Sequence, residues 1–450
     1  MHSLGIDFGT SGARAIVINR NLEIRSSVSL SFPTDCDDWA RLWRQTLFDL
    51  IEQIPLELRQ TIRAIAINGT SSTVLICDRA GHPLSSPILY NDDRGSAVLD
   101  QVKAIAPPNH TVISATSSLA KLLWFDWQFS NSSITPSPPT IQSPPELGDL
   151  GGVQDLGGFR GLLGKPSTQN YFLHQADWLA FWLHGQIGIS DYHNALKLGY
   201  DVQNLCYPDW LQNLKVPFQL PKVLAPGTPI APITPEISDR LNLPSDCQVC
   251  AGTTDSIAAF LASGVQSAGE AVTSLGSTLV LKLLSDTRVD DARYGIYSHR
   301  LGNQWLVGGA SNTGGAVLKQ FFSPEELMRL SQDIDPQQES YLDYYPLLKP
   351  GERFPINDAH LPPRLEPRPE RAIDFLHGLL ESIARIEARG YRLLQELGAS
   401  PLQRVYTAGG GSTNEVWQQI RSRQLQVPVL RSEQTEAAHG TARLAMQGIR

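Results

Sequence analysis

Residues 249–282 read VCAGTTDSIAAFLASGVQSAGEAVTSLGSTLVLK, and they indicate how the whole chain is built. An apolar lead-in precedes the turn 252–255, a short helical pattern and a β-hairpin that opens through residues 275–278. Asp255 would stand at the mouth of the helix, and the Gly/Ser/Thr turn would present backbone N–H groups to phosphate oxygens. A site that transfers a phosphoryl group needs both features.

The N-terminus repeats this pattern. Residues 3–19, SLGIDFGTSGARAIVIN, form a predicted strand ending in Asp7, a Gly/Thr/Ser turn and a second strand. Beside TSLGSTLVLKLL they look like a distant internal repeat. Two similar domains facing each other would form a cleft between two phosphate-binding turns. The residues expected to line the β- and γ-phosphates are Thr10, Ser11 and Gly12 on one side and Gly276, Ser277 and Thr278 on the other.

Composition bounds the possibilities. A chain of 450 residues predicts two domains, and 41% hydrophobic with 18% charged residues is typical of a soluble globular protein. The net charge of −8 disfavours nucleic acid and anionic membranes as partners. No apolar run approaches the roughly 20 residues of a membrane helix. The N-terminus leaves no room for a signal peptide, and five irregularly spaced cysteines suggest a reducing compartment, so we expect a cytoplasmic protein.

Cys247 and Cys250 form the one C-x-x-C pair. A redox or zinc site would require a second pair or nearby histidines at ligand spacing, and neither is present. We expect both to be small buried residues flanking a strand.

The motifs together resemble a known family. GIDFGTSGARA is similar to the first phosphate motif of the FGGY carbohydrate kinases and, more distantly, of the actin, Hsp70 and hexokinase ATPases, and GTTDS is similar to the FGGY catalytic-base segment. The resemblance implies an α/β fold of two actin-like (RNase H-like) ATPase domains with a cleft between them. It also implies that Asp255 removes the proton from a sugar hydroxyl while ATP donates the phosphoryl group. On the residues alone, Asp255 could equally be an ordinary helix N-cap.

The resemblance also points to a sugar site. A strand at residues 62–67 delivers the loop NGTSS, where FGGY kinases usually carry a Gly-Gln-Met-His-Gly type sequence that touches the sugar. Here small hydroxyls, Ser71 and Ser72, would make these contacts. The loop is most similar to the D-ribulose kinases (xylulose kinase-like proteins) of photosynthetic organisms. It argues against a glycerol kinase or a standard xylulokinase and favours D-ribulose.

Two further motifs are candidates for sugar recognition. Residues 90–94, YNDDR, match the family's W-x-D-x-R segment with Asp92 as the acid, although a solvated turn is equally compatible. His193, in SDYHNAL, could be taken for a base. We expect a structural or substrate-orienting role instead, because Asp255 is better placed and a lone histidine is usually satisfied by local hydrogen bonds.

The nucleotide site is predicted from two glycine-rich turns. Residues 305–316 form a strand-to-helix turn without the lysine of a Walker loop, so P-loop chemistry is excluded. By resemblance, Gly315 would lie by the nucleotide phosphates. Residues 405–414 resemble the adenosine motif D-G-G-G/A-x-x-N, in which Gly410, Gly411 and Asn414 would contact ATP. Ala408 replaces the family's Asp, which predicts a modest affinity for ATP.

The domain organisation follows from composition shifts. Residues 130–168 are rich in Pro and Gly and read as a surface insertion. A Pro-rich traverse at residues 208–246 cannot enter the middle of a sheet. We therefore expect a sugar-binding FGGY N-terminal domain at residues 1–245 and a nucleotide-binding FGGY C-terminal domain at residues 246–450.

The resemblance extends to the metal and the substrates. Asp7 would hold Mg²⁺ and lie by the substrate, because hard oxygen ligands suit that ion, and Arg14 would add positive charge. The expected partners are a small-molecule sugar and ATP, with Ser71, Ser72, Asp92, Asp7 and Asp255 around the sugar. An actin- or Hsp70-like ATPase switch and a sugar sensor with degraded catalysis stay open as alternatives. A Rossmann oxidoreductase is excluded, because GIDFG lacks the G-x-G-x-x-G pattern.

Overall fold

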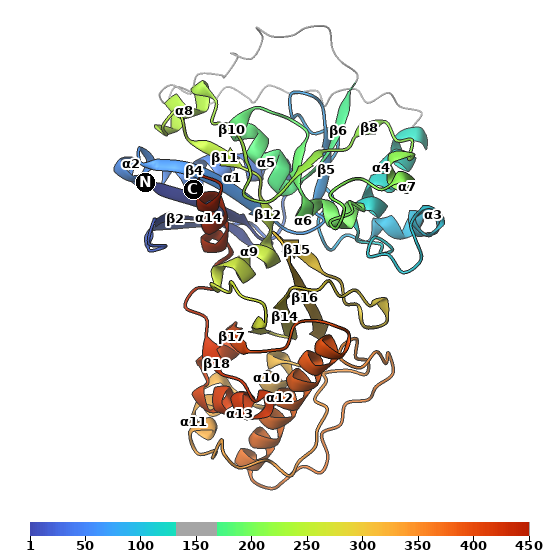
Figure 1. Cartoon of the computed structure of the whole chain (residues 1–450), viewed down its shortest axis with the longest axis vertical. Coiled ribbons are helices and arrows are strands. Elements are labelled where there is room, and N and C mark those ends of the chain that lie inside the picture. The colour runs from blue at the N-terminus through green and yellow to red at the C-terminus, as the bar shows by residue number, and fades with distance from the viewer. Residues whose placement is uncertain (132–168, 450) are drawn as a thin grey trace.

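The computed structural model describes residues 1–131 and 169–449. Figure 1 shows two lobes stacked along the long axis of the molecule, with α9 (Asp255–Ala262) and β15 (His299–Leu301) at their junction. Each lobe is built on one large sheet. The predicted insertion at residues 130–168 falls almost wholly outside the described residues.

The first lobe contains a seven-stranded sheet in the order β10-β11-β4-β1-β2-β3, with β12 also pairing with β4. Its strands are β1 (His2–Phe8), β2 (Gly12–Asn19), β3 (Ile24–Ser31), β4 (Ile62–Gly69), β10 (Pro229–Pro232), β11 (Gln248–Cys250) and β12 (Thr253–Thr254). The Pro-rich β10 lies at the sheet edge, where missing N–H donors cost little.

The second lobe contains a six-stranded sheet in the order β15-β16-β14-β13-β17-β18. Its remaining strands are β13 (Glu270–Leu275), β14 (Leu279–Ser285), β16 (Gln304–Ser311), β17 (Arg404–Ala408) and β18 (Val429–Arg431). The long helix α12 (Ala372–Glu396) packs its apolar face on this sheet. The other helices of this lobe are α10 (Gly315–Phe321), α11 (Pro324–Gln332) and α13 (Glu415–Leu425).

The two sheets share one topology. The run β3-β2-β1-β4-β11 has two antiparallel pairings followed by two parallel ones, and the run β16-β14-β13-β17-β18 has the same sequence of pairings. The internal repeat seen in the two hairpins therefore extends through five strands of each lobe. This confirms the expected pair of actin-like domains.

Smaller elements complete the first lobe. They are β5 (Val74–Cys77), β6 (Asn170–His174), β7 (Ile189–Asp191), β8 (Phe218–Gln219), β9 (Lys222–Leu224), α1 (Trp39–Glu52), α2 (Leu56–Arg59), α3 (Leu99–Ile105), α4 (Ser118–Asn131), α5 (Gln175–His184), α6 (Tyr192–Ala195), α7 (Asp209–Gln212) and α8 (Pro235–Leu241). Helix α4 and strands β5 and β6 enclose an apolar core of their own beside the large sheet. This region carries the predicted sugar loops.

The C-terminal helix α14 (Ala437–Gln447) returns to the first lobe, where Figure 1 shows it in red among the blue strands. A Cβ on Gly5 would lie 2.1 Å from the Ala438 carbonyl oxygen, so glycine in β1 permits this close packing. Strands β11 and β12 also belong to the first sheet. The boundary at residues 245/246 stays a prediction, and these later segments lie across it.

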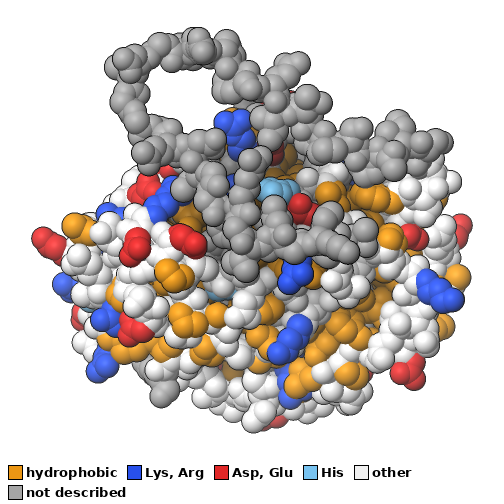
Figure 2. All heavy atoms as spheres, turned by 90° about the horizontal axis from the view of Figure 1, so that it is seen from above, with side chains coloured by type: hydrophobic (Ala, Val, Ile, Leu, Met, Phe, Trp, Pro, Cys, Tyr) orange, Lys and Arg blue, Asp and Glu red, His pale blue; other side chains and the backbone are white. Residues whose placement is uncertain are grey.

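Both cysteines of the C-x-x-C pair are buried in the first lobe. Burial raises the pKa of the Cys247 and Cys250 thiols to about 12, which leaves both unreactive. Every described helix is too short or too polar to span a bilayer. Figure 2 shows the first-lobe end of the molecule, where Lys/Arg and Asp/Glu side chains are interspersed on the visible described surface.

Candidate active site

The carboxyl ends of three parallel strands, β1, β4 and β12, lie side by side in the first sheet. In the register of this sheet, Asp7 on β1 lies opposite Asn68 on β4, and Asn68 lies opposite Thr253 on β12. Asp255 follows two residues later as the first residue of α9. The carboxyl ends of parallel strands are where ligands bind in α/β sheets, so the fold brings Asp7 and Asp255 together at a favourable place.

Asp7 is largely buried, and its Oδ1 atom has no hydrogen-bond partner among the described residues. Burial and the nearby charge of Asp255 raise the pKa of Asp7 to about 7, against the opposing effects of Arg14 and Asn68. A carboxyl group in this position is poised to accept a cation.

Asp255 starts α9, while the N-cap of this helix is Thr254, so Asp255 is not the ordinary cap that its sequence context left open. Its Oδ1 accepts a hydrogen bond from the Ser256 N–H at 2.6 Å. Burial raises the pKa of Asp255, and the charges of Lys282 and Lys197 oppose that rise.

Sequence reasoning missed both lysines. Lys282 on β14 donates to the Ser256 carbonyl in the first turn of α9. Burial lowers the pKa of Lys282 to about 8, although the charge of Asp255 opposes this. The available signal for Lys282 was its place as a single lysine in the apolar run LVLKLL. A charged side chain in a buried strand is rare unless an opposite charge or a hydrogen-bond acceptor pairs with it.

The residues fit a divalent cation only in part. The described residues contain no cluster of three His, Cys, Asp or Glu that could hold a metal by itself. The unpaired Asp7 oxygen and the like charge of Asp255 nonetheless favour a cation between them. Mg²⁺ commonly keeps several waters and binds through one or two carboxylates plus substrate phosphates, so this pair is compatible with it.

The turn after β1 is closed by a hydrogen bond from the Gly9 N–H to the Gly12 carbonyl at 3.0 Å. Thr10 and Ser11 are exposed at its tip, where their hydroxyls are available to a ligand, while the Ser11 carbonyl accepts a hydrogen bond from the Phe32 N–H at 2.9 Å. The Arg14 guanidinium forms an ion pair with Glu436, just before α14. The Glu436 carboxylate thus already neutralises Arg14 in this structure. The role of Arg14 toward phosphate stays a prediction.

The glycine-rich turns of the second lobe converge. The Gly315 N–H at the start of α10 donates to the Gly276 carbonyl at 2.9 Å, and a Cβ on Gly409 would lie 3.3 Å from the Gly276 nitrogen. Ser277 is exposed between the half-buried Gly276 and Thr278. Turns that are distant in sequence therefore pack against one another, and their contact with phosphate stays a prediction.

The residues of the turn after β17 differ in the space around them and in their hydrogen bonds. Nothing lies within 4 Å of a Cβ placed on Gly410, whereas one on Gly411 would meet the Trp417 ring at 2.8 Å. The Asn414 Oδ1 caps α13 by accepting from the Trp417 N–H, and its Nδ2 donates to Ser331 Oγ at 2.8 Å. Contacts of these residues with ATP stay predictions.

The predicted sugar loop, residues 68–72, overlaps the end of β4, and residues 70–73 form the connection to β5. The Thr70 N–H donates to Gln175 Oε1 at 3.1 Å, and the Thr70 and Thr73 hydroxyls share a hydrogen bond of 2.6 Å. Ser71 is partly exposed, and the buried Ser72 hydroxyl has no partner among the described residues. The Ser71 hydroxyl is therefore open to a ligand, whereas the Ser72 hydroxyl is unpartnered but enclosed.

Asp92 stands beside this loop. It accepts two hydrogen bonds from the Arg94 guanidinium, at 2.9 and 2.6 Å. Burial favours a raised pKa, but the hydrogen bonds from Arg94 outweigh it and hold the Asp92 pKa below its usual value. Lys121, which sequence reasoning also missed, is buried next to it. A lone lysine in SSLAKLLWFDW was the signal for it.

Comparison with known proteins agrees with this arrangement. The family model for the C-terminal domain of the FGGY carbohydrate kinases matches residues 271–448, and that for their N-terminal domain matches residues 2–130. Together the two matches span more than half of the chain. The protein belongs to the FGGY family of carbohydrate kinases. It is therefore an ATP-dependent enzyme that transfers a phosphoryl group to a sugar.

Relatives of this FGGY kinase cover nearly all of its length. It is 21% identical to the xylulose kinase of Staphylococcus xylosus, over 99% of this chain and 90% of the relative, and 21% identical to the gluconokinase of Bacillus subtilis, over 94% and 82%. The crystal structure of xylulose kinase from Rhodospirillum rubrum superposes with a TM-score of 0.78 at 19% identity, over 100% of this chain and 90% of that one. These likenesses support the fold and leave the sugar open.

His193 of the FGGY kinase is used structurally. Its Nδ1 shares a hydrogen bond of 2.7 Å with the Thr253 hydroxyl, and its Nε2 one of 2.6 Å with the Arg300 carbonyl on β15. Burial lowers its pKa to about 4, so the ring is neutral near pH 7. Both nitrogens being engaged favours the structural role over that of a base.

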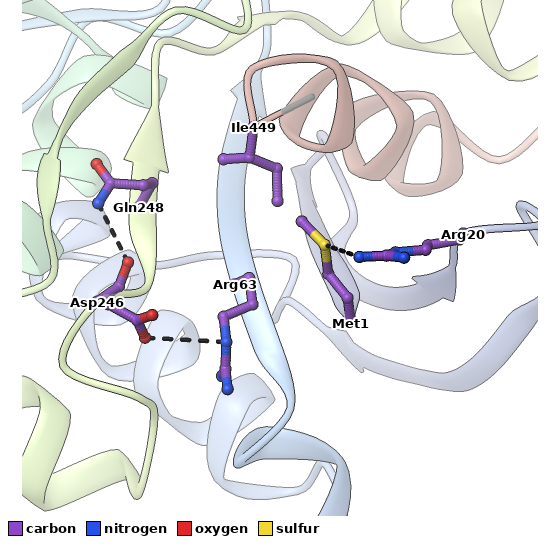
Figure 3. Close-up of a pocket in the computed structure, with 6 residues that line it drawn as sticks. All are labelled: Met1, Arg20, Arg63, Asp246, Gln248 and Ile449. Carbon is purple, nitrogen blue, oxygen red and sulfur yellow. Dashed lines mark hydrogen bonds and ion pairs between the residues drawn. The ribbon is translucent and has the colours of Figure 1, made fainter.

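Two cavities of the FGGY kinase lie away from Asp7 and Asp255. One of 380 Å³ sits at the opposite end of β1, where Figure 3 shows the Arg20 side chain directed at Met1 and Arg63 directed at Asp246. A second, of 550 Å³, lies behind α9 between the lobes, against α6 and α14. Neither is lined by the carboxylates of the candidate active site.

Proposed function

We propose that this FGGY kinase phosphorylates a ketopentose, converting D-ribulose to D-ribulose 5-phosphate at the expense of ATP. The loop at residues 70–73 carries the proposal. Its serine hydroxyls are small donors and acceptors that suit a short polyol. Ser71 is partly exposed, and the enclosed Ser72 hydroxyl has no partner among the described residues. Larger side chains would be expected here if the loop followed the usual family pattern.

The reaction needs in-line positioning, charge neutralisation and a base for the attacking hydroxyl. Asp255 would take the proton from the sugar hydroxyl as its oxygen attacks the γ-phosphorus, and ADP would leave. Asp7 would hold Mg²⁺ together with phosphate oxygens and water. Bound there, the ion would neutralise charge on the phosphates. Lys282 and Lys197 support this assignment, because their charges favour the ionised form of Asp255.

The substrates would meet at the junction of the lobes. We assign the sugar to residues 1–245 and the nucleotide mainly to residues 246–450, with the β- and γ-phosphates lined from both sides of the cleft. The sugar would contact Ser71, Ser72 and Asp92. The residues assigned to ATP are Thr10, Ser11, Gly12, Arg14, Gly276, Ser277, Thr278, Gly315, Gly410, Gly411 and Asn414. Closure of the lobes would exclude water and suppress ATP hydrolysis. We place the enzyme in the cytoplasm, because its five cysteines are free.

D-Xylulose is the second candidate. It is supported by the xylulose kinases among the relatives, although identities near 21% do not transfer a substrate. It differs from D-ribulose in the configuration of one hydroxyl, so the same loop could accept both to different extents.

The deciding experiment measures ADP release with Mg-ATP on D-ribulose, D-xylulose, L-ribulose, glycerol and no sugar. The wild type and Asp255→Ala are compared, and Asp246→Ala on the exposed surface serves as the matched control. A D-ribulose-dependent rate that only Asp255→Ala abolishes would support the proposal. A preference for D-xylulose would replace the substrate and keep the base. Equal rates with and without sugar would point to an ATPase switch or sensor and overturn the proposal.

A further inference from the structure

Lys121 lies where two loops of the first lobe come together. It is fully buried on α4, one turn after the start of that helix. Its Nζ donates to the Ser72 carbonyl at 2.8 Å and to the Leu89 carbonyl at 2.6 Å, with the Tyr90 carbonyl at 3.4 Å. The first partner belongs to the serine loop and the others to the segment that leads into Asp92.

An ammonium group has three N–H donors, and here it faces three carbonyl oxygens. Burying it is costly, and burial lowers the Lys121 pKa to about 7. Asp92 opposes that fall, while the charges of Lys197 and Arg94 add to it. An apolar side chain would fill the space without this cost but could not hold the carbonyls. The buried ammonium group of Lys121 therefore serves to hold the carbonyl groups of the two loops.

The serine loop needs such support. Ser72 has a φ of 65°, in the left-handed region that residues other than glycine rarely adopt. Its carbonyl is held by Lys121, and its hydroxyl is left without a partner in the described part of the chain. The lysine thus holds the backbone of Ser72 in this left-handed conformation, which fixes where the loop presents Ser71 and encloses the unpartnered Ser72 hydroxyl.

The segment around Asp92 is anchored to the same helix at a second point. The Arg94 guanidinium, which binds Asp92, stacks on the Trp124 ring of α4 at 4.7 Å. Gly95 packs so closely that a Cβ there would lie 2.7 Å from the Ala120 side chain. Helix α4 is therefore the common support of both loops, and Lys121 contacts both at once.

We propose that Lys121 is a positioning residue of the sugar site, which holds the Ser71–Ser72 loop and the Asp92 segment at their productive separation. The inference rests on the proposed function in one respect, namely that these two loops contact the sugar. Lys121 itself would not touch the substrate, since carbonyl oxygens take all of its donors. Its loss should act on sugar binding and leave the nucleotide side of the cleft intact.

The kinetic test compares the wild type with Lys121→Met, Lys121→Arg and the exposed control Lys103→Met on α3. A displacement of one loop should raise the sugar KM roughly ten- to hundredfold in Lys121→Met, with the ATP KM unchanged. Lys121→Arg keeps charge and donors and should show a smaller rise. An unchanged sugar KM in folded Lys121→Met, or an equal rise in the ATP KM, would overturn the proposal.

A second readout does not depend on turnover. Hydrogen exchange should quicken roughly tenfold in Lys121→Met at the Thr73 and Asp92 amides, which bond within the two loops, and stay unchanged in α12. Exchange like that of the wild type at both amides would overturn the positioning role. If no sugar is turned over by the wild type, the proposed function fails on its own, and the exchange result still decides whether Lys121 holds the loops. A faster exchange throughout Lys121→Met would show general loosening of the fold and would also count against the proposal. Lys121→Arg, which keeps the charge and the donors, checks whether exchange in the two loops follows the loss of these hydrogen bonds.

Discussion

Asp7 and Asp255 reach the same point from β1 and α9, and burial together with the charge of Asp255 raises the pKa of Asp7 to about 7. This relationship has a consequence for stability. A carboxyl group whose pKa is higher in the folded state than in the unfolded state binds more protons when folded. The contribution of Asp7 to folding stability therefore falls as the pH rises from about 4 to about 7 and levels off above that range.

Asp7→Asn should remove this penalty. Three pKa units correspond to at most about 4 kcal/mol, so the variant should be more stable than the wild type at pH 8, with the difference shrinking toward pH 5. Urea unfolding at the two pH values measures the effect. Asp246→Asn, on an exposed side chain, is the control and should show no such trend. An Asp7→Asn variant less stable than the wild type at pH 8 would contradict the electrostatic account.

Lys282→Met should shift the pH dependence of the kinase reaction. The positive charge of Lys282 lowers the pKa of Asp255, and a base must be ionised to act. Removing the charge raises that pKa, so activity should begin to fall at a higher pH as the solution is acidified. The measurement is kcat/KM from pH 5 to 9. Lys282→Arg, which keeps the charge, should retain the wild-type acid limb, and identical limbs in all three proteins would refute the coupling.

Gly410→Ala tests the nucleotide turn. The space beside this residue is open, so a methyl group should leave the melting temperature unchanged. If the purine lies against the turn, the same methyl group should raise the ATP KM roughly tenfold, or about 1.4 kcal/mol.

Gly315→Ala is the contrasting change, because its Cβ would lie 2.7 Å from the Gly276 carbonyl oxygen. That variant should lose stability as well as ATP affinity. A Gly410→Ala enzyme with normal ATP kinetics would remove the turn from the nucleotide site.

Arg421 and Glu387 form a buried ion pair beneath the second sheet, with bonds of 2.6 and 2.7 Å. Arg421→Met would strand a buried carboxylate and should cost about 3–5 kcal/mol, whereas the double change with Glu387→Met should cost less than the single one. Chemical denaturation measures both. The exposed Arg364, which pairs with Asp343, is the control, and Arg364→Met should cost no more than about 1 kcal/mol. A double variant as unstable as the single one would contradict the account.

Much of the fold could be predicted because its signals are local. The hairpins around Asp7 and residues 275–278 have apolar strands and Gly/Ser/Thr turns within a few residues, and α12 shows its period directly. The turn residues were found for the same reason. Their use was harder to predict: Arg14 pairs with Glu436, and Asn414 caps α13. Those partners come from distant segments or from the geometry of a helix start.

The sequence by itself determined the two-lobed fold and the places of Asp7 and Asp255, because backbone turns and hydrophobic periodicity are properties of short segments. Only the tertiary structure decided that β4 brings Asp7 beside Thr253, and that Lys121, Lys197 and Lys282 surround the carboxylates and the sugar loops. A lysine in an apolar run can be recognised from the sequence as unusual. Its partners cannot, because they depend on contacts between segments that are far apart in the chain. Burial and neighbouring charges shift a pKa according to distances in space, and the order of residues in the sequence does not give those distances.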